Sequence, residues 1–485
     1  FSPSRIYYIP SHIRKDTVAD GSDIQDRLVN LINVPDINLR SNLYTTEDFL
    51  DSLQVSKNYM ADQNLYIRER IFDMWTGDWN KTNENWEWQS HTVNDSVIYT
   101  PIVIDRNHAF TKVDGVLFKQ MLKMLSLDFI CNYDSLILKD TKKINKLAFA
   151  LDMAVAGRSD ESVWIRQAQE IRRQMTDSLI DSAFTYLPEG VKHDEIELIK
   201  RKLKRRRLEL EAVASQYYRL LQRTPVVAGT NQSDYFLIER QAPDRTVLRI
   251  YDPETGDCRL EQQFSGKETK ELWLYGLAGN DTFEVKGNTR KDFPIYLISG
   301  EGENQYQLNH NRKIHVYDKD YKYDYQKIKY HKISFTPWGI YDSDKGISLG
   351  TFFTYTMYGF KRAPFTYQHR IGYNYLKGFM YAGIFPNYDG RRRLYLNASI
   401  SSPRNFENFF GFGNNTAGYK EEKKNYNRVK LRTYMFNPSF EMDLRKEEVM
   451  TFFGSLDMYK AKRTDDRYIY TVYGEDHPIS ARIIS

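Results

Sequence analysis

Hydrophobic positions along the chain follow two periods, and the changes of period divide the sequence into four parts. Residues 1–116 mix short β-like runs with helical runs, which indicates an α/β region. In residues 117–224, apolar side chains recur with the 3.6-residue period of amphipathic helices. In residues 225–335 and 336–485 the period drops to two, as in strands with one buried face. The pattern predicts a multidomain α+β protein in which a helical segment of the first region precedes two β-rich parts.

The alternation in residues 336–485 is longer and more aromatic than in the preceding β-rich part. Within residues 346–360, six side chains share one face: Ile347, Leu349, Thr351, Phe353, Tyr355 and Met357. Similar stretches follow at residues 368–385, 392–401, 427–443 and 448–460. Strands of soluble proteins average about five or six residues, whereas strands that cross a membrane need roughly ten residues of alternating character. We therefore expect a membrane-embedded sheet whose lipid-facing side includes Phe353, Tyr355 and Met357.

A soluble, closed β domain is the rival interpretation, because a soluble sandwich can also be rich in tyrosine. Aromatic residues make up 14% of the chain, with 36 Tyr against 27 Phe. Rings with a polar tip suit the headgroup layers at the two surfaces of a membrane. The sequence has no stretch approaching the roughly 18 apolar residues of a membrane-spanning helix.

The charge and the cysteine spacing bear on three kinds of function: nucleic-acid binding, lipid binding, and metal or redox chemistry. The 485 residues include 69 basic and 64 acidic side chains, a net charge of +5, and we expect no nucleic-acid partner. A basic run at residues 200–207 lies on a predicted helix with an apolar stripe, so a solvated helix face is favoured over contact with lipid headgroups. Cys131 and Cys258 match no metal or redox spacing. Because the chain begins with Phe1, we expect it to be a piece of a longer protein.

A polar loop after a predicted helix carries the strongest candidate for chemistry. The helix ends near Gly77, and the loop that follows contains Asp78, Asn83 and Asn85. A strand-like run further along the chain ends in Asp105. Kinase-like folds use a loop Asp, a downstream Asn and a strand-terminal Asp to place a base and two Mg²⁺ ligands near a phosphate. The four polar residues are therefore candidates for a catalytic shell in which Asp105 holds Mg²⁺.

The residues around this loop resemble the pattern R-E-R-x-x-D-x-x-x-G-D-W-D-R-H-x-D-x-W-x-W … D-R-D-x-A-F. That pattern belongs to the middle part of large outer-membrane proteins of Gram-negative bacteria, in which a metallophosphoesterase precedes a BamA/TamA-type β-barrel of the surface-antigen kind. The family's loop is similar to the active loop of spore-coat (CotH-like) kinases. The matching residues are Asp78, Trp79, Trp86, Trp88, Asp105, Arg106, Ala109 and Phe110.

The chain departs from this family pattern at the catalytic positions. Asn80, Lys81 and Thr82 stand where the family has Asp-Arg-His. The lysine of the nucleotide-binding lobe, expected upstream, is not found in the matching part. The resemblance therefore implies a degenerate, pseudokinase-like region in residues 1–116, with active phosphotransfer as the alternative.

A glycine-rich turn at residues 276–284 resembles the calcium-binding nonapeptide G-G-x-G-x-D-x-U-x, with Asp281 at the acidic position. A weaker echo comes 23 residues later, from Gly279 to Gly302, and it lacks the Asp. Calcium β-rolls need consecutive repeats, because each ion lies between adjacent turns. We therefore favour two turns of a β-structure tightened by glycine, with Ca²⁺ at Asp281 as the alternative.

The C-terminal strands carry the most specific resemblance. Residues 346–350, 354–365 and 369–370 are similar to the first strands of the same barrel family, and so are residues 405–414 and 426–429. The resemblance covers nearly the whole chain but omits the family's phosphoesterase and most of its barrel. It implies an outer-membrane location with the N-terminal region in the periplasm. It also implies outer-membrane lipid as a partner, and nascent outer-membrane proteins or lipoproteins as further candidate partners.

The resulting expectation is a non-catalytic periplasmic and barrel portion of an outer-membrane assembly or transport protein of BamA/TamA type. An active or relic kinase-like phosphotransferase domain attached to a membrane barrel is the alternative. Enzymatic activity stays undecided and is not favoured, because the phosphoesterase would lie upstream. We expect no cofactor, and Mg²⁺ at Asp105 or Ca²⁺ at Asp281 are the metal alternatives.

Overall fold

The structure, a computed structural model of the chain, is a mixed α/β protein with several sheets and antiparallel strands. It describes residues 4–9, 27–32, 42–113, 115–124, 127–185, 193–241, 244–287, 292–308, 313–318, 321–362, 364–387, 391–411, 425–445, 448–462, 464, 466–473 and 483–484. The chain forms two compact units, which are Phe1–Phe118 with Asp128–Gln326 and Lys119–Leu127 with Lys327–Ser485. Residues 412–414, which belong to the barrel resemblance, lie outside the described part.

The first unit begins with a hairpin and a small sheet. The hairpin consists of β1 (Ser4–Ile9) and β2 (Arg27–Ile32). The sheet has the order β3 (Leu43–Tyr44), β5 (Trp86–Val93), β6 (Ser96–Val103) and β4 (Tyr59–Ala61). Helices α1 (Thr46–Val55) and α2 (Gln63–Thr76) pack on this sheet, and the 3-10 turn η2 (Asn83–Asn85) leads into β5. Aromatic rings fill the space between them, as where Phe49 stacks on Trp88 with ring centroids 3.7 Å apart.

The helical segment follows the 3.6-residue pattern but breaks more often than the sequence predicts. Its helices are α3 (Val116–Met124), α4 (Thr141–Ile144), α5 (Phe149–Ala156), α6 (Glu161–Gln174), α7 (Asp177–Ala183), α8 (His193–Arg207) and α9 (Leu210–Leu221), with the 3-10 turn η3 (Leu138–Asp140). Helix α7 begins after Thr176, whose hydroxyl accepts a hydrogen bond from the backbone N–H of Leu179 and caps the helix. Tighter i,i+3 bonds at Leu208 and Glu209 separate α8 from α9. No helix among the described residues is long and apolar enough to cross a membrane.

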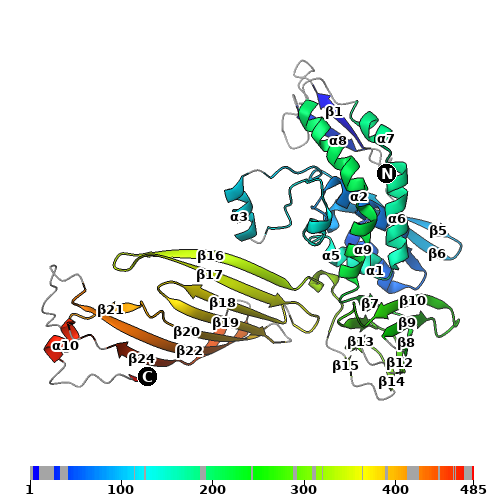
Figure 1. Cartoon of the computed structure of the whole chain (residues 1–485). Coiled ribbons are helices and arrows are strands. Elements are labelled where there is room, and N and C mark those ends of the chain that lie inside the picture. The colour runs from blue at the N-terminus through cyan, green and yellow to red at the C-terminus, as the bar shows by residue number, and fades with distance from the viewer. Residues whose placement is uncertain are drawn as a thin grey trace. The chain divides into compact units, whose positions relative to one another are not determined.

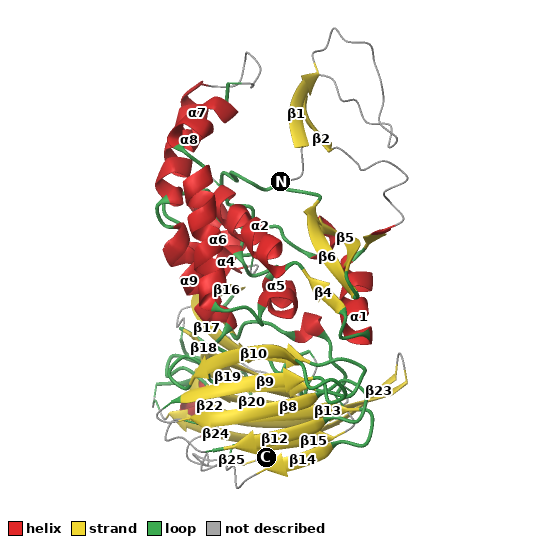
Figure 2. Ribbon diagram, turned by 90° about the vertical axis from the view of Figure 1, so that its right-hand side faces the viewer, coloured by secondary structure: helices red, strands yellow, loops and turns green. Residues whose placement is uncertain are grey.

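Two further sheets of the first unit share one core, and the chain alternates between them. The first, all parallel, has the order β15 (Ile314–Asp318), β13 (Ile295–Gly300), β11 (Leu272–Tyr275) and β7 (Val226–Ala228). The second has the order β10 (Cys258–Ser265), β9 (Arg245–Tyr251), β8 (Tyr235–Gln241), β12 (Thr282–Lys286) and β14 (Gln305–Leu308) (Figure 2). Leu272 pairs with Ile295 and Thr282 with Gln305, so this turn of the coil takes 23 residues. Phe236 and Phe283 stack between the sheets with centroids 4.6 Å apart.

The second unit is a ten-stranded antiparallel sheet whose strands lie side by side in Figure 1. Its main path is β16 (Lys332–Asp342), β17 (Gly346–Met357), β18 (Tyr367–Asn374), β19 (Gly378–Pro386), β20 (Arg392–Ile400), β22 (Arg428–Arg445), β24 (Leu456–Lys462) and β25 (Ile483–Ile484). The short strands β21 (Phe406–Asn408) and β23 (Glu448–Phe453) pair with β22. The remaining elements are η4 (Tyr325–Lys327), in the chain between the β-rich parts, and α10 (Tyr468–Tyr473).

Two of the long strands predicted for this sheet are wrong. Residues 368–385 form a hairpin, β18 and β19, and residues 448–460 divide into β23 and β24. The first turn contains Leu376 and ends at Gly378, whose φ of +87° is the left-handed conformation that favours glycine. Apolar residues continue the alternation through this turn, which hid it in the sequence.

Candidate functional site

The loop that carries Asp78 is held at the end of α2 by contacts from distant helices. Gly77 ends α2 at φ +81°, and a Cβ there would lie 2.6 Å from the ring of Tyr133. Arg206 of α8 donates hydrogen bonds to the carbonyls of Trp75 at 2.8 Å and Met74 at 2.5 Å. A cation at a helix C-terminus is favoured by the helix dipole. Burial lowers the pKa of Arg206 to about 10, so this member of the basic run stays charged at pH 7 and has a structural position.

Lys81 lies between the two aspartates that the sequence places at the candidate site. Its side chain is 1% exposed and its Nζ donates to the Asp78 carboxylate and to the backbone carbonyl of Asp105. The same Nζ lies 3.7 Å from Oδ1 of Asp73. The Asp105 carboxylate turns away and accepts a bond of 2.6 Å from the backbone N–H of Asn107. The structure thus brings Asp78 and Asp105 together around a lysine and not around an open space between carboxylates.

Asp78 and Lys81 belong to a larger buried ion network. Arg70 binds Asp73 at 3.0 Å and Asp152 at 2.8 Å, and the side chains of all three are at most 1% exposed. Arg106 donates to Asp73 at 2.8 Å and also to Glu69. Burial raises the pKa of Asp78 against the opposing attraction of Lys81. Every carboxylate of this network therefore has a cationic partner.

Two tyrosines complete the network on the side of Asp152. The hydroxyl of Tyr66 donates to Oδ1 of Asp152 at 2.7 Å, and that of Tyr217 donates to Oδ2 at 2.5 Å. Burial and the charge of Asp152 raise the pKa of Tyr66 well above its usual value. Since α2, α5 and α9 each supply a member, the network joins helices that are distant in the sequence.

The two candidate asparagines stabilise the loop itself. Asn85 accepts hydrogen bonds from the backbone N–H of Thr82 at 2.7 Å and from its hydroxyl at 3.0 Å, which closes a capping box around η2. Asn83 donates to Glu47 at 3.0 Å and to the hydroxyl of Tyr325. Neither amide meets the Asp78 carboxylate within the described residues.

The network contains residues that the sequence analysis did not select. In the sequence, Lys81 stood out only as a departure from the family pattern. Asp73, Asp152 and Arg70 were not predicted to be site residues. The available signal was the buried face of α2, where Glu69, Arg70 and Asp73 fall among Ile67, Ile71 and Met74. Charged residues on such a face require partners. In the described ranges no cluster of three or more His, Cys, Asp or Glu is arranged to hold a metal ion.

Asp281 occupies a stacked turn of the β coil. Three turns, each leading into a strand of the second sheet, place Asp234, Asp281 and Asn304 at equivalent positions. Oδ1 of Asp281 accepts from the backbone N–H of Asp234 at 2.9 Å, and the N–H of Asp281 donates to Oδ1 of Asn304, also at 2.9 Å. The side chains thus form a ladder along the coil.

The space around Asp281 is closed. A Cβ at Gly276 would lie 2.1 Å from its Oδ2 and 2.5 Å from the carbonyl of Ser299, so the turn requires glycine there. Oδ2 is buried and has no hydrogen-bond partner in the described structure. Burial raises the pKa of Asp281 to about 8, so this carboxyl is protonated at pH 7. Ca²⁺ takes six to eight oxygen ligands, mostly ionised or carbonyl oxygens, and the ladder geometry favours the structural role of Asp281.

The ten-stranded sheet has one apolar face and one polar face. Cross-strand register places Phe335, Phe353 and Ile371 in one row, and the same parity continues across the sheet. Exposed large apolar side chains of this face include Ile333, Phe335, Tyr341, Ile347, Leu349, Phe353, Ile371, Phe379, Phe436, Phe440 and Leu456. Of the three predicted lipid-facing residues, Phe353 is exposed, and Tyr355 and Met357 are half-buried.

The distribution of exposure along β17 is inverted relative to a soluble protein. Ile347 and Leu349 are 74% and 70% exposed, whereas Ser348 between them is 1% exposed. Thr354 and Thr356 on the same strand, and Asn374 opposite, are also buried. Soluble proteins bury apolar side chains and rarely expose apolar patches larger than a few hundred Å². The exposure along this face therefore differs from that of the water-facing surfaces of most soluble proteins.

Neither a protein-family model nor a curated protein nor a solved structure matches this chain significantly.

Proposed function

We propose that the ten-stranded sheet is the leading part of an outer-membrane β-barrel of BamA/TamA type. In this proposal the chain is a non-catalytic periplasmic and barrel portion of an outer-membrane assembly or transport protein. The inverted sheet is the observation that carries it, because apolar side chains are exposed where a soluble sheet would bury them. Moving one large apolar side chain out of water gains roughly 1.5–3 kcal/mol, so a lipid environment stabilises this face.

The edges of the sheet add a requirement. Along the described path, β16 pairs only with β17 at one end of the sheet, and β25 pairs only with β24 at the other. In hydrocarbon, each unpaired backbone N–H or C=O costs several kcal/mol. Embedding in lipid therefore requires further strands that close the sheet, in agreement with a barrel larger than the strands described.

The ion network supports a scaffold function for the helical region. Lys81 occupies the space between Asp78 and Asp105 where a phosphate-bound Mg²⁺ would need free carboxylate oxygens. Arg70, Asp73 and Asp152 tie α2 to α5 with buried ion pairs. In the proposal this region is the periplasmic part, which positions an enzyme domain or recruits lipid or nascent protein near the barrel.

Membrane association is tested by expressing the native protein in a Gram-negative host and extracting its membranes with sodium carbonate at high pH. The proposal expects the full chain to remain in the membrane pellet and to enter solution only with detergent. Recovery of residues 336–485 in the aqueous fraction after gentle lysis would end the membrane assignment.

The assembly or transport role is tested separately by depleting the native protein. Levels of outer-membrane proteins and the asymmetry of outer-membrane lipids are then measured over several generations. A fall in the first supports protein assembly, and a loss of the second supports lipid transport. No change in either quantity would contradict the proposed role, while leaving the membrane location to the extraction experiment.

A further inference from the structure

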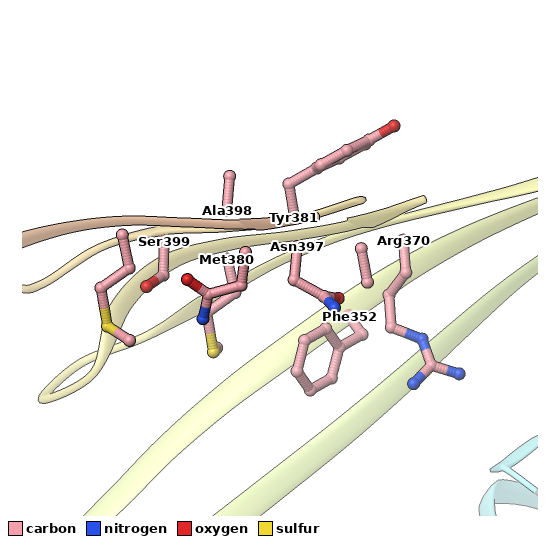
Figure 3. Close-up of a pocket in the computed structure, with 10 residues that line it drawn as sticks. Phe352, Arg370, Met380, Tyr381, Asn397, Ala398 and Ser399 are labelled. Atoms are coloured by element: carbon pink, nitrogen blue, oxygen red, sulfur yellow. The ribbon is translucent and has the colours of Figure 1, made fainter. Parts of the chain in front are cut away.

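The polar face of the ten-stranded sheet contains a cavity of about 290 Å³ across β17 to β22. In Figure 3 the side chains of Phe352, Arg370, Met380 and Asn397 lie on one side of the strands, whereas Tyr381 lies on the other. Binding sites for small molecules are typically about 300–1,000 Å³, so this cavity is just below that range. Its size suits one chain of a lipid-like molecule better than two.

Strand register places the lining side chains of the polar face in two neighbouring rows, which Thr354 and Gly372 complete outside the lining. The first row is polar apart from an alanine and consists of Thr354, Arg370, Ala382, Asn397 and Asn437. The second row consists of Phe352, Gly372, Met380, Ser399 and Met435. The two rows are two residues apart along each strand, which is roughly 7 Å. The cavity is therefore polar along one side and apolar along the other.

Small residues produce the hollow, and an aromatic ring forms its wall. A Cβ at Gly372 would lie 2.3 Å from the ring of Phe352, so this ring covers the glycine. Trp338 stacks against the other side of Phe352 with centroids 5.3 Å apart and fixes the ring in place. The small side chains of Ala382 and Ser399 leave space at the centre of the cavity, while Met380 and Met435 supply flexible apolar surface.

Arg370 brings an uncompensated positive charge to the polar row. Its side chain is exposed, its Nε donates to the hydroxyl of Thr354 at 3.3 Å, and it forms no ion pair with any described residue. The Asn397 amide, one strand beyond Ala382, has no hydrogen-bond partner within the described ranges. The backbones of Arg370 and Asn397 are two strand spacings apart, roughly 10 Å. A long guanidinium side chain and an amide facing the same cavity can recognise a carboxylate through several donors at once.

We propose that this cavity binds a single-chain anionic amphiphile, with its carboxylate on Arg370 and Asn397 and its hydrocarbon chain over Met380 and Met435. Charge complementarity and the two-row order of the lining select this class over neutral chains and over small anions. The inference concerns the polar face alone and does not depend on the apolar face meeting lipid.

The test is a fluorescence titration of the full chain in a neutral detergent with dansyl-labelled undecanoic acid. The proposal expects saturable binding that unlabelled decanoate displaces and that inorganic phosphate does not. The methyl ester of the probe, which lacks the charge, is expected to bind at least tenfold more weakly. Equal binding of acid and ester, or displacement by inorganic phosphate, would overturn the proposed class of ligand.

Variants locate the site. Arg370→Gln is expected to weaken binding at least tenfold, and Arg370→Lys to weaken it less, because the charge remains. Arg432→Gln is the control for charge loss elsewhere on the sheet, since Arg432 is exposed, lies on the opposite face and does not line the cavity. Circular dichroism and thermal unfolding establish that each variant folds. The site would be refuted if Arg370→Gln bound the probe as tightly as the wild type does. It would also be refuted if Arg432→Gln lost as much binding as Arg370→Gln.

Discussion

Replacing Asp281 by Asn changes how the stability of the β coil depends on pH. Asn is close to Asp in shape, and its Oδ1 can accept the hydrogen bond from the Asp234 N–H, as Asn304 does for Asp281 in the next turn. The substitution removes the carboxyl whose Oδ2 is buried without a partner. The ladder is therefore expected to persist while one titration disappears.

The magnitude follows from the pKa of Asp281, which burial raises from the usual 3.8 to about 8. Because the folded state holds this proton more tightly, its stabilising contribution is complete below pH 3.8 and is lost as the pH rises towards 8. Between these limits the free energy of unfolding falls by about 1.4 kcal/mol per pH unit through this group. From pH 5 to pH 7 the Asn variant thus gains on the wild type by about 3 kcal/mol.

The assay is hydrogen exchange measured by mass spectrometry on peptides from β11 to β14, at pH 5, 6 and 7, with intrinsic exchange rates corrected for pH. The slope of opening free energy with pH is expected to be less negative in Asp281→Asn than in the wild type. Asp257→Asn, at an exposed turn residue of the same domain, is the control and leaves the slope unchanged. Identical slopes in wild type and Asp281→Asn would refute the assignment of a buried, protonated carboxyl.

Three other predictions concern the ion network, the coil and nucleotide binding. Lys81→Met is expected to destabilise the first unit by about 3 kcal/mol in urea unfolding, because it leaves buried charge without its partner. Adding Asp78→Asn to this variant is expected to recover part of the lost stability. An unchanged midpoint of urea unfolding in Lys81→Met would contradict the network. Gly276→Ala is expected to cost about 1–3 kcal/mol by overpacking against Asp281, and calorimetry showing no loss would contradict the closed turn. Mg²⁺-ATP is expected to leave thermal stability unchanged, whereas binding with Kd near 0.1 mM at millimolar nucleotide would add on the order of 1 kcal/mol; a stabilising shift abolished by Asp105→Ala would favour the phosphotransferase alternative.

Local features of the fold were predictable because their causes are local. The end of α2 at Gly77 and the cap at Thr176 depend on residues within one helical turn. Alternation marked β8, β9 and β11 for the same reason. The turn at Leu376 was not predicted, because the alternating pattern of apolar residues continues on both sides of it.

The candidate site was predictable only in part, because its contacts are tertiary. Asp78 and Lys81 are three residues apart, so their pairing is visible in the sequence, but the Asp105 carbonyl comes from a different strand end. Arg70 and Asp152 are separated by 82 residues, and no sequence pattern in either segment indicates that the two side chains form an ion pair. The cavity around Arg370 depends in the same way on a register across several strands.

The central claim is that the odd-numbered face of β17 meets lipid. Its most direct test is a nitroxide scan of residues 347–356 in the full chain, with Cys131 and Cys258 replaced by Ser and the protein reconstituted in lipid vesicles. Electron paramagnetic resonance power saturation compares accessibility to oxygen, which concentrates in hydrocarbon, with accessibility to a water-soluble nickel complex. Lipid contact of this face predicts a period of two, with high oxygen accessibility at 347, 349, 353 and 355 and low values at 348, 354 and 356. High accessibility to the nickel complex at the odd positions, or no alternation, would contradict it.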